Sequence, residues 1–195
     1  MHKKTAAAFA ALALCLTSCA ARENTQISAP SAEALAQVYE FAIGEERDNA
    51  FFALRVNEAV RLSSIGEYRA EDGCDILAVS IDTENLTEYD LPMSCYDFDI
   101  VWAQGEPQQA FSMGGEDNGY GFEDYPDDAE IPEGGALSGW LYYVAPQECE
   151  GLSLRYEELY DDGTAGGVWQ VSLGSPEYPA YNAQADESAQ TLAWE

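Results

Sequence analysis

Lysine and histidine are almost absent from this chain. His2, Lys3 and Lys4 stand at the start of the sequence, and neither residue type occurs again. A Ser-His or Cys-His nucleophile pair needs an imidazole base, and Ser-Lys and Schiff-base mechanisms need a lysine amine. A phosphate-binding loop of the Gly-Lys-Ser/Thr kind is absent as well. These enzyme classes are excluded for the chain after residue 18, and we expect no enzymatic activity.

Positive charge is equally scarce. After residue 18 the sequence holds six arginines against 36 aspartates and glutamates, a formal charge of −30. Such a field repels phosphate backbones and anionic headgroups, so nucleic acid and a bare phospholipid surface are disfavoured as partners. Partners are expected to be cationic, neutral or metal ions. Acidity also keeps an exported protein soluble, so it does not by itself indicate a function.

The N-terminal apolar run is too short to be a transmembrane helix, which needs about 20 residues. Residues 5–16 are uncharged, rich in Ala and Leu, and follow the basic residues at positions 2–4, which is the layout of a signal peptide. The segment Leu16-Thr17-Ser18-Cys19 resembles the lipobox of bacterial lipoproteins, in which cleavage precedes an acylated cysteine. An ordinary secretory signal is the alternative.

The resemblance implies lipid on Cys19 and a location on the outer face of the bacterial cell membrane. Each buried methylene contributes about 0.8 kcal/mol, so several acyl chains anchor a protein stably. The membrane is then a partner through the N-terminal lipid alone. The folded domain needs no membrane-binding surface of its own.

Short segments that alternate between apolar and polar residues make up most of the remaining chain. They begin near Phe52, Leu77, Tyr96, Leu152 and Trp169, and residues 137–144 form one more that is apolar on both faces. In the first segment, one side of the strand is predicted to carry Phe52, Leu54, Val56, Val60 and Leu62. In the third segment, one side is predicted to carry Tyr96, Phe98, Ile100 and Trp102. Short strands between turn residues, without crossover helices, predict an antiparallel β-sandwich.

The sequence divides into four parts on this interpretation. We expect a signal peptide over residues 1–18, a lipid-anchored flexible tether over 19–45, a β-sandwich domain over 46–180 and a C-terminal tail over 181–195. Pro30-Ser31-Ala32-Glu33 predicts the start of a short helix within the tether that runs to about Phe41.

The order of features over residues 50–160 resembles a known family. Asp75–Asn85 is similar to a strand that ends in a Thr-x-Asn turn, and Phe98 lies in the next strand. The segments 132–135, 139–146 and 152–156 look like the family's glycine turn, hydrophobic strand with a proline break, and final strand. The chain thus resembles small Gram-positive lipoproteins of unassigned function with an immunoglobulin-like, telokin-like β-sandwich. Those proteins usually have lysine-rich surfaces, and this chain departs from them there.

Three cysteines remain for thiol chemistry, because Cys15 leaves with the signal peptide and Cys19 carries lipid. Cys74, Cys95 and Cys149 are 21 and 54 residues apart, and no histidine accompanies them, which disfavours zinc. One bridge and three buried thiols both remain open. If a bridge forms, the expected topology favours Cys95–Cys149 and places Cys74 at the other end of the sandwich.

The connection from Gly114 to Gly135 is the longest one expected, and it is acidic without a basic residue. Its carboxylates are Glu116, Asp117, Glu123, Asp124, Asp127, Asp128, Glu130 and Glu133. One interpretation is a weak calcium site, because calcium takes six to eight oxygen ligands, although the alternating Asp pattern of a dedicated calcium loop is absent. Solvated, mutually repelling side chains are the alternative. We expect no other cofactor.

We expect a non-catalytic interaction module that faces another protein of the cell envelope. The alternative is an extracellular ligand-binding module for carbohydrate or calcium. Exposed aromatic side chains would favour sugar, but aromatics at strand spacing more often belong to a core; the candidates are Trp102, Tyr120, Tyr125, Trp140 and Tyr142. The acidic connection and the strand of Trp140 are the first places to look for a recognition surface.

Processing at Cys19 is directly testable. A fatty-acid analogue supplied to growing cells should label the wild-type protein, whose mature form should lack residues 1–18. The Cys19→Ala variant should remain unlabelled, because it has no thiol to acylate at that site. Equal labelling of the two proteins would contradict the lipid anchor.

Overall fold

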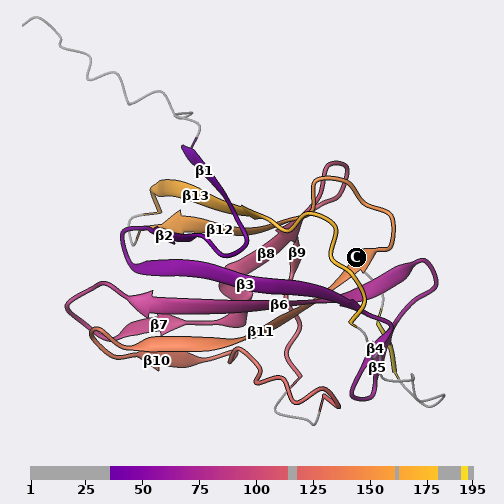
Figure 1. Ribbon diagram of the computed structural model, residues 1–195. Coiled ribbons are helices and arrows are strands. Elements are labelled where there is room, and N and C mark those ends of the chain that lie inside the picture. Colours follow the sequence, from indigo (N-terminus) through magenta and orange to yellow (C-terminus); the bar gives the residue numbers. More distant parts are fainter. Residues whose placement is uncertain (1–35, 114–117, 161–162, 180–189, 193–195) are drawn as a thin grey trace, which may run out of the picture. The chain divides into compact units, whose positions relative to one another are not determined.

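Two sheets face each other in the computed structural model (Figure 1). The structure describes residues 36–113, 118–160, 163–179 and 190–192, so the signal peptide and Cys19 lie outside the described residues. The first sheet has the order β11-β6-β3-β2, from Ala136–Pro146, Cys74–Asn85, Phe52–Leu62 and Glu46–Asp48. The second sheet has the order β1-β13-β12-β8-β9, from Val38–Ala42, Ala165–Ser172, Ser153–Leu159, Phe98–Val101 and Gln108–Gln109.

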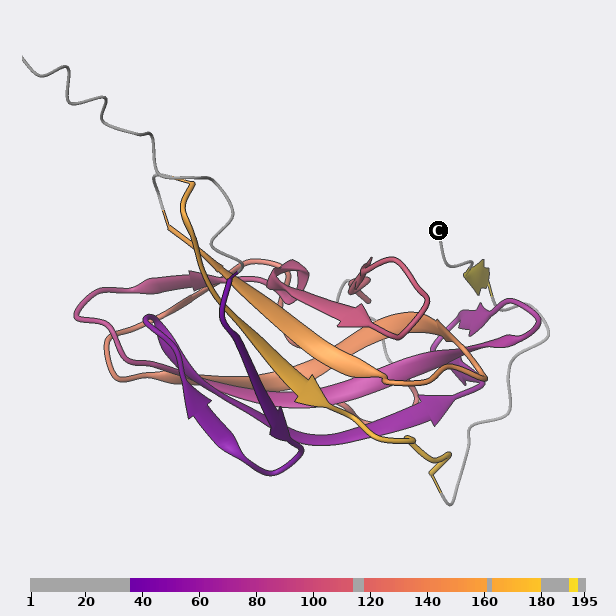
Figure 2. The same ribbon diagram turned by 90° about the horizontal axis from the view of Figure 1, so that it is seen from above.

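Two smaller groups of strands complete the fold. β7 (Leu91–Met93) pairs with β10 (Ala129–Ile131), and β5 (Tyr68–Ala70) lies between β4 (Ser64–Ile65) and β14 (Gln190–Leu192). Seen from above, β12 and β13 are laid over β3 and β6 (Figure 2). Among the described residues, no helix has the length and hydrophobicity needed to cross a membrane.

The strand order confirms an immunoglobulin-like β-sandwich. An immunoglobulin domain pairs its A, B and E strands in one sheet and its C, F and G strands in the other. β3, β6 and β11 occupy the first set of positions here, and β8, β12 and β13 occupy the second. All of these neighbours are antiparallel, and β1 is added to β13 by parallel pairing.

The predicted helix ending at Phe41 is wrong over the residues that the structure describes. Val38–Ala42 is strand β1, and its partners in β13 begin with Val168 and end with Ser172. Phe41 is buried in the core and Tyr39 stacks on Trp169, with 4.8 Å between ring centroids. Tertiary packing therefore decides the conformation, and the folded part of the chain reaches into the range assigned to the tether.

A β-bulge in β3 interrupts the predicted alternation of the first strand, so the prediction is wrong for the second half of that strand. The register to β6 shifts between Val56 and Glu58, and an extra residue in a strand exchanges its two faces. Val60 and Leu62 consequently pack on the outer face of the first sheet and not with the first half of the strand. Arg61, expected on the outside, points into the sandwich and is 7% exposed.

Two hydrophobic clusters follow from this arrangement. The larger one fills the space between the sheets and includes the predicted face of β6, Leu77, Val79 and Ile81. The smaller one lies on the outer face of the first sheet, where Leu62, Ile76 and Tyr142 are fully buried. The first sheet is thus covered on both faces, which explains why residues 137–144 are apolar on both sides.

The predicted Cys95–Cys149 bridge is wrong, because the strand order separates the two thiols. β8 and β12 are antiparallel, so the start of one lies beside the end of the other. Cys95 precedes β8 and Cys149 precedes β12, which puts them at opposite ends of the pair, with Cys74 near Cys149 opposite Pro146. All three cysteines are free, and burial raises the pKa of Cys95 to about 11.

A buried ion pair closes one end of the sandwich. Arg61 donates from Nη1 to Asp75 Oδ2 at 3.1 Å and to the carbonyl of Pro146 at 3.1 Å. Gln147 and the hydroxyl of Tyr178 donate to the same carboxylate at 3.1 and 2.8 Å. Side-chain exposure is only 9% for the arginine and 3% for the aspartate, so each charge depends on the other for its solvation.

Replacing one member of this pair should therefore cost more than replacing both. We expect Arg61→Met to lower the free energy of unfolding by about 3–5 kcal/mol, because it leaves Asp75 buried and unpaired. The double variant Arg61→Met/Asp75→Leu should recover a large part of that loss in urea unfolding. The exposed Arg47–Glu45 pair is the control, and Arg47→Met should change stability by less than about 1 kcal/mol. A double variant less stable than Arg61→Met would contradict this account.

Candidate binding groove

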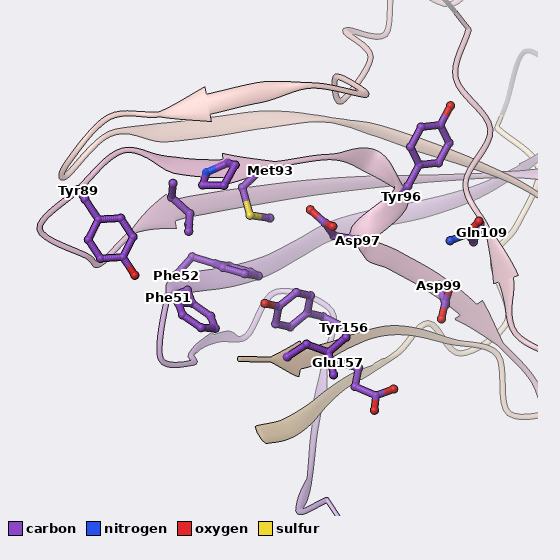
Figure 3. Close-up of a pocket in the computed structure, with 13 residues that line it drawn as sticks. Phe51, Phe52, Tyr89, Met93, Tyr96, Asp97, Asp99, Gln109, Tyr156 and Glu157 are labelled. Atoms are coloured by element: carbon purple, nitrogen blue, oxygen red, sulfur yellow. The ribbon is translucent and has the colours of Figure 1, made fainter. Parts of the chain in front are cut away.

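An open groove of about 560 Å³ lies where the end of β12 and the start of β8 meet the β7 segment. Its wall contains Phe51, Phe52, Tyr89, Leu91, Pro92, Met93, Tyr96, Asp97, Asp99, Gln109, Tyr156, Glu157 and Leu159. Figure 3 shows Tyr89 at one end near Phe51 and Phe52, and Asp99 and Gln109 at the other. The volume is in the range of sites that take a small ligand or a few side chains.

The aromatic wall at Phe51 and Phe52 is held by a turn and a buried carboxylate. Asn49 accepts hydrogen bonds on Oδ1 from the backbone N–H groups of Phe51 and Phe52, at 2.8 and 2.9 Å. Glu158, which is 3% exposed, accepts from the N–H of Ala50 at 2.9 Å. Phe52 then packs edge-on against Tyr156, with 4.7 Å between centroids, and forms a rigid floor.

Glu158 also ties the end of β12 to β13. Its Oε2 accepts from the N–H of Gly167 at 3.1 Å and from the hydroxyl of Tyr160 at 3.2 Å. A Cβ on Gly166 would stand 2.1 Å from this oxygen, so any other residue there would displace the Glu158 carboxylate. The register shift between Glu157 and Leu159 places Glu158 inward, and both flanking residues line the groove.

Asn85 holds the turn that carries Tyr89. This side chain is 1% exposed, and its amide donates to the carbonyls of Tyr89 and Ile131 at 2.7 and 2.9 Å. Its oxygen accepts from the backbone N–H and the hydroxyl of Thr87, at 2.8 and 2.7 Å. Tyr89 itself is 57% exposed, so its ring is presented by the turn and not buried in the core.

A capping box turns the chain away from the second sheet just before β8. Ser94 and Asp97 bracket the short 3₁₀ turn Cys95–Asp97, with Ser94 N–H donating to Asp97 Oδ2 and Tyr96 N–H donating to Ser94 Oγ. The predicted strand therefore begins at Phe98, and Tyr96 is 44% exposed on the groove wall instead of sharing a face with Phe98. Desolvation raises the pKa of Asp97, and the hydrogen bond from Ser94 partly offsets this.

The remaining carboxylates of the groove share one arginine. Arg155 Nη2 lies 3.1 Å from Asp99 Oδ2 and 3.9 Å from Glu157 Oε2. Arg155 and Asp99 are paired across β12 and β8, so this contact is set by the strand register. None of the described residues that line the groove is basic. The groove is therefore apolar at its floor and negatively charged along one side.

The acidic connection singled out from the sequence does not form this groove. Glu116 and Asp117 lie outside the described residues, and Glu123, Asp124, Asp127 and Asp128 do not line it. Asp124 accepts a hydrogen bond from the Tyr142 hydroxyl at 2.8 Å, which also raises the pKa of Tyr142 after the larger effect of burial. In the part of the chain that the structure describes, no three Asp, Glu, Cys or His side chains gather as a metal site would require.

Aromatic packing orders the described part of this connection. Phe122 stacks on Trp140 with 3.9 Å between centroids, and Tyr120 stacks on Phe122 at 5.3 Å. Tyr125 is 3% exposed, and its hydroxyl lies 2.9 Å from that of Thr83. A Cβ on Gly139 would come within 2.6 Å of the Tyr125 backbone, so the connection lies directly on β11. Tyr125 and Tyr142 thus belong to the core.

Two features of the sequence, apart from the alternation pattern, indicate parts of the groove. Ser94-Cys95-Tyr96-Asp97 has the Ser-x-x-Asp spacing of a capping box, which predicts a turn where a strand was expected. Tyr89 stands in a polar stretch between two strands, where an aromatic ring has no core to enter. The approach of β7 to β12 follows from long-range pairing, and a single sequence does not contain that information.

No family model and no curated protein matches this chain. Among solved structures, the yjhA protein from Bacillus subtilis matches with a TM-score of 0.50 and 18% identity, over 70% of this chain and 99% of its own. An uncharacterized β-sandwich protein from Clostridium difficile 630 has a TM-score of 0.47 and 13% identity, over 73% of this chain and 98% of its own. The likeness to yjhA is one of fold.

A candidate lipoprotein from Bacillus subtilis, ycdA, matches with a TM-score of 0.49 and 14% identity, over 65% of this chain. The match spans only 38% of ycdA. The strand order itself supports the β-sandwich part of the resemblance drawn from the sequence. The telokin-like subtype stays a prediction.

The raised pKa of Asp97 makes the stability of the protein depend on pH in a defined direction. A carboxyl whose pKa is higher in the folded than in the unfolded state costs stability once pH rises above its titration. Asp97→Asn removes the charge and keeps an oxygen acceptor for Ser94. Urea unfolding of both proteins at pH 3 and pH 7 measures this. We expect the free energy of unfolding of the variant, minus that of wild type, to be larger at pH 7 than at pH 3. A larger variant-minus-wild-type difference at pH 3 than at pH 7 would contradict this account.

Proposed function

We propose that this protein is a lipid-anchored, extracytoplasmic binding module whose β-sandwich holds a partner in the groove without catalysing a reaction. One observation carries the proposal, namely that Tyr89 and Tyr96 line a hollow while being 57% and 44% exposed. Both aromatic rings lie in segments held by dedicated hydrogen bonds, as described above. Large exposed aromatics around a concave surface are typical of recognition sites.

The anchor and the lack of catalysis are supported by sequence features. The Leu16-Thr17-Ser18-Cys19 segment supports lipid on the outer face of the membrane. The chain beyond residue 18 contains no lysine or histidine to act as base or nucleophile. Asp99 and Glu157 both lie close to Arg155, with oxygen-to-nitrogen distances of 3.1 and 3.9 Å, so these carboxylates already have a protein partner.

Carbohydrate and calcium are less well supported as ligands than a protein partner. The aromatics first considered for sugar are partly core residues, and the acidic connection forms no described cluster of metal ligands. The groove offers apolar contact area in Phe51, Pro92 and Leu159, the last of which is 62% exposed, together with a charged rim. An apolar centre with a polar rim is the usual anatomy of a protein interface.

Site-specific photocrosslinking in living cells tests this function. A benzophenone amino acid would replace Tyr89 or Tyr96, one at a time, in the full-length protein, and Val38 would be replaced as a matched exposed position outside the groove. We expect the same discrete crosslinked product from both groove positions and no such product from Val38. Equal crosslinking from Val38, or none from either groove position, would contradict the groove as the binding surface.

A further inference from the structure

The groove runs beside a short strand edge that has a neighbour on one side only. The ladder between β12 and β13 continues to the pair Leu159–Ala165. The ladder between β12 and β8 ends earlier, at Tyr156–Phe98, because the Ser94–Asp97 capping box leads the chain away. Glu157 to Leu159 therefore present backbone groups to the groove, and the described residues supply no strand partner there.

Such an edge is a template for one more strand. An extended peptide that adds to an edge gains main-chain hydrogen bonds, and its alternate side chains enter the pockets beside it. The wall beside this edge is apolar, with Pro92 exposed and Phe51 half-buried on it, while Leu91, Met93 and Phe52 are buried behind it. A segment in this position would direct every second side chain toward that apolar wall.

The negative charge of the groove indicates which kind of peptide segment it would bind. Asp97, Asp99 and Glu157 line the groove, and Arg155 is the cation that offsets two of them. The groove therefore keeps a net negative charge within a domain that is itself strongly acidic. An acidic ligand would be repelled, whereas a lysine or arginine beside an apolar residue would meet a carboxylate.

We infer that the groove receives an extended, positively charged segment of a partner protein, which pairs with Glu157–Leu159 as an added strand. This inference rests on the proposed function and specifies the partner of the same site. The carboxylates provide the preference for basic side chains, and the backbone edge provides orientation. Tyr89 and Tyr96 cover the ends of the bound segment.

A peptide array of defined charge tests the inference. The probes are heptapeptides with valine, isoleucine or tyrosine at alternate positions and with net charges from −3 to +3 at the others. Binding of the full-length protein, purified in a non-ionic detergent, would be followed by fluorescence anisotropy. We expect affinity to rise with positive charge and to fall with added salt. Backbone N-methylation of the best peptide at alternate residues should weaken binding about tenfold or more, because it removes donors and leaves side chains in place.

Matched variants separate the groove from the general acidity of the protein. Asp97→Asn/Asp99→Asn/Glu157→Gln keeps hydrogen-bond acceptors and should weaken binding of the best basic peptide about tenfold, because it removes the charges that basic side chains would meet. Glu40→Gln/Glu67→Gln/Asp72→Asn removes three exposed charges outside the groove and should weaken it less than about twofold. A wild-type circular dichroism spectrum and a cooperative thermal unfolding transition of both variants are the control for folding.

Four outcomes would overturn the inference. Three concern charge, namely no binding of any basic peptide, equal binding of neutral or acidic peptides, and equal loss in the two triple variants. The fourth is full binding of the N-methylated peptide, which would contradict pairing as an added strand. In each case a crosslink from Tyr89 and Tyr96 in cells would leave the proposed function standing with a partner of another chemistry, so the two failures are distinguishable.

Discussion

Strand β6 carries a buried polar side chain near each end, and the rest of the domain is arranged around that constraint. It lies between β3 and β11 and is covered on both faces, so it has no surface to water along most of its length. Asp75 near its start is 2% exposed and Asn85 at its end is 1% exposed. Each must be satisfied by protein groups, because a buried polar atom without a partner costs about 1–3 kcal/mol.

The two ends solve this requirement in different ways. Asp75 accepts hydrogen bonds from Arg61, Gln147 and Tyr178, and these contacts close one end of the sandwich. Asn85 bonds only to neutral groups, chiefly backbone atoms of the turn that follows it and of β10. The first solution fixes the packing of strands, and the second fixes a loop conformation. The groove lies at the Asn85 end, where rigid turns and not strand pairing position the exposed rings.

Much of the fold was predictable from local pattern, and the failures have physical causes. Period-two alternation located the long strands correctly because burial of one face dominates the choice of residue at each position. It failed at the bulge of β3, since an inserted residue exchanges the faces without a signal in composition. The helix-start signal at Pro30–Glu33 failed at Val38–Ala42, where the short segment takes its conformation from pairing with β13.

The candidate site was harder to predict because its parts come from five separate segments. Asp97 and Glu157 are distant in sequence, and only the register between β8 and β12 brings their strands together. The acidic connection drew attention because its charges are contiguous. In the structure, Asp124 within it is a hydrogen-bond partner of Tyr142, and its aromatic residues are packing elements. Density of charge along a chain is therefore a poor guide to where a folded surface is specific.

The general acidity of the protein and the specific groove can both contribute to binding the proposed partner, in different ways. With 36 acidic residues, a basic segment is attracted to many places on the surface, but beyond about 8 Å such attraction is screened at physiological ionic strength. Long-range charge can thus raise the encounter rate without choosing a site. The choice falls to features that act at contact distance, which here are the backbone edge at Glu157–Leu159 and the apolar wall beside it. Because these features are neutral, they would hold the proposed segment in register even where salt weakens the attraction that brought it there.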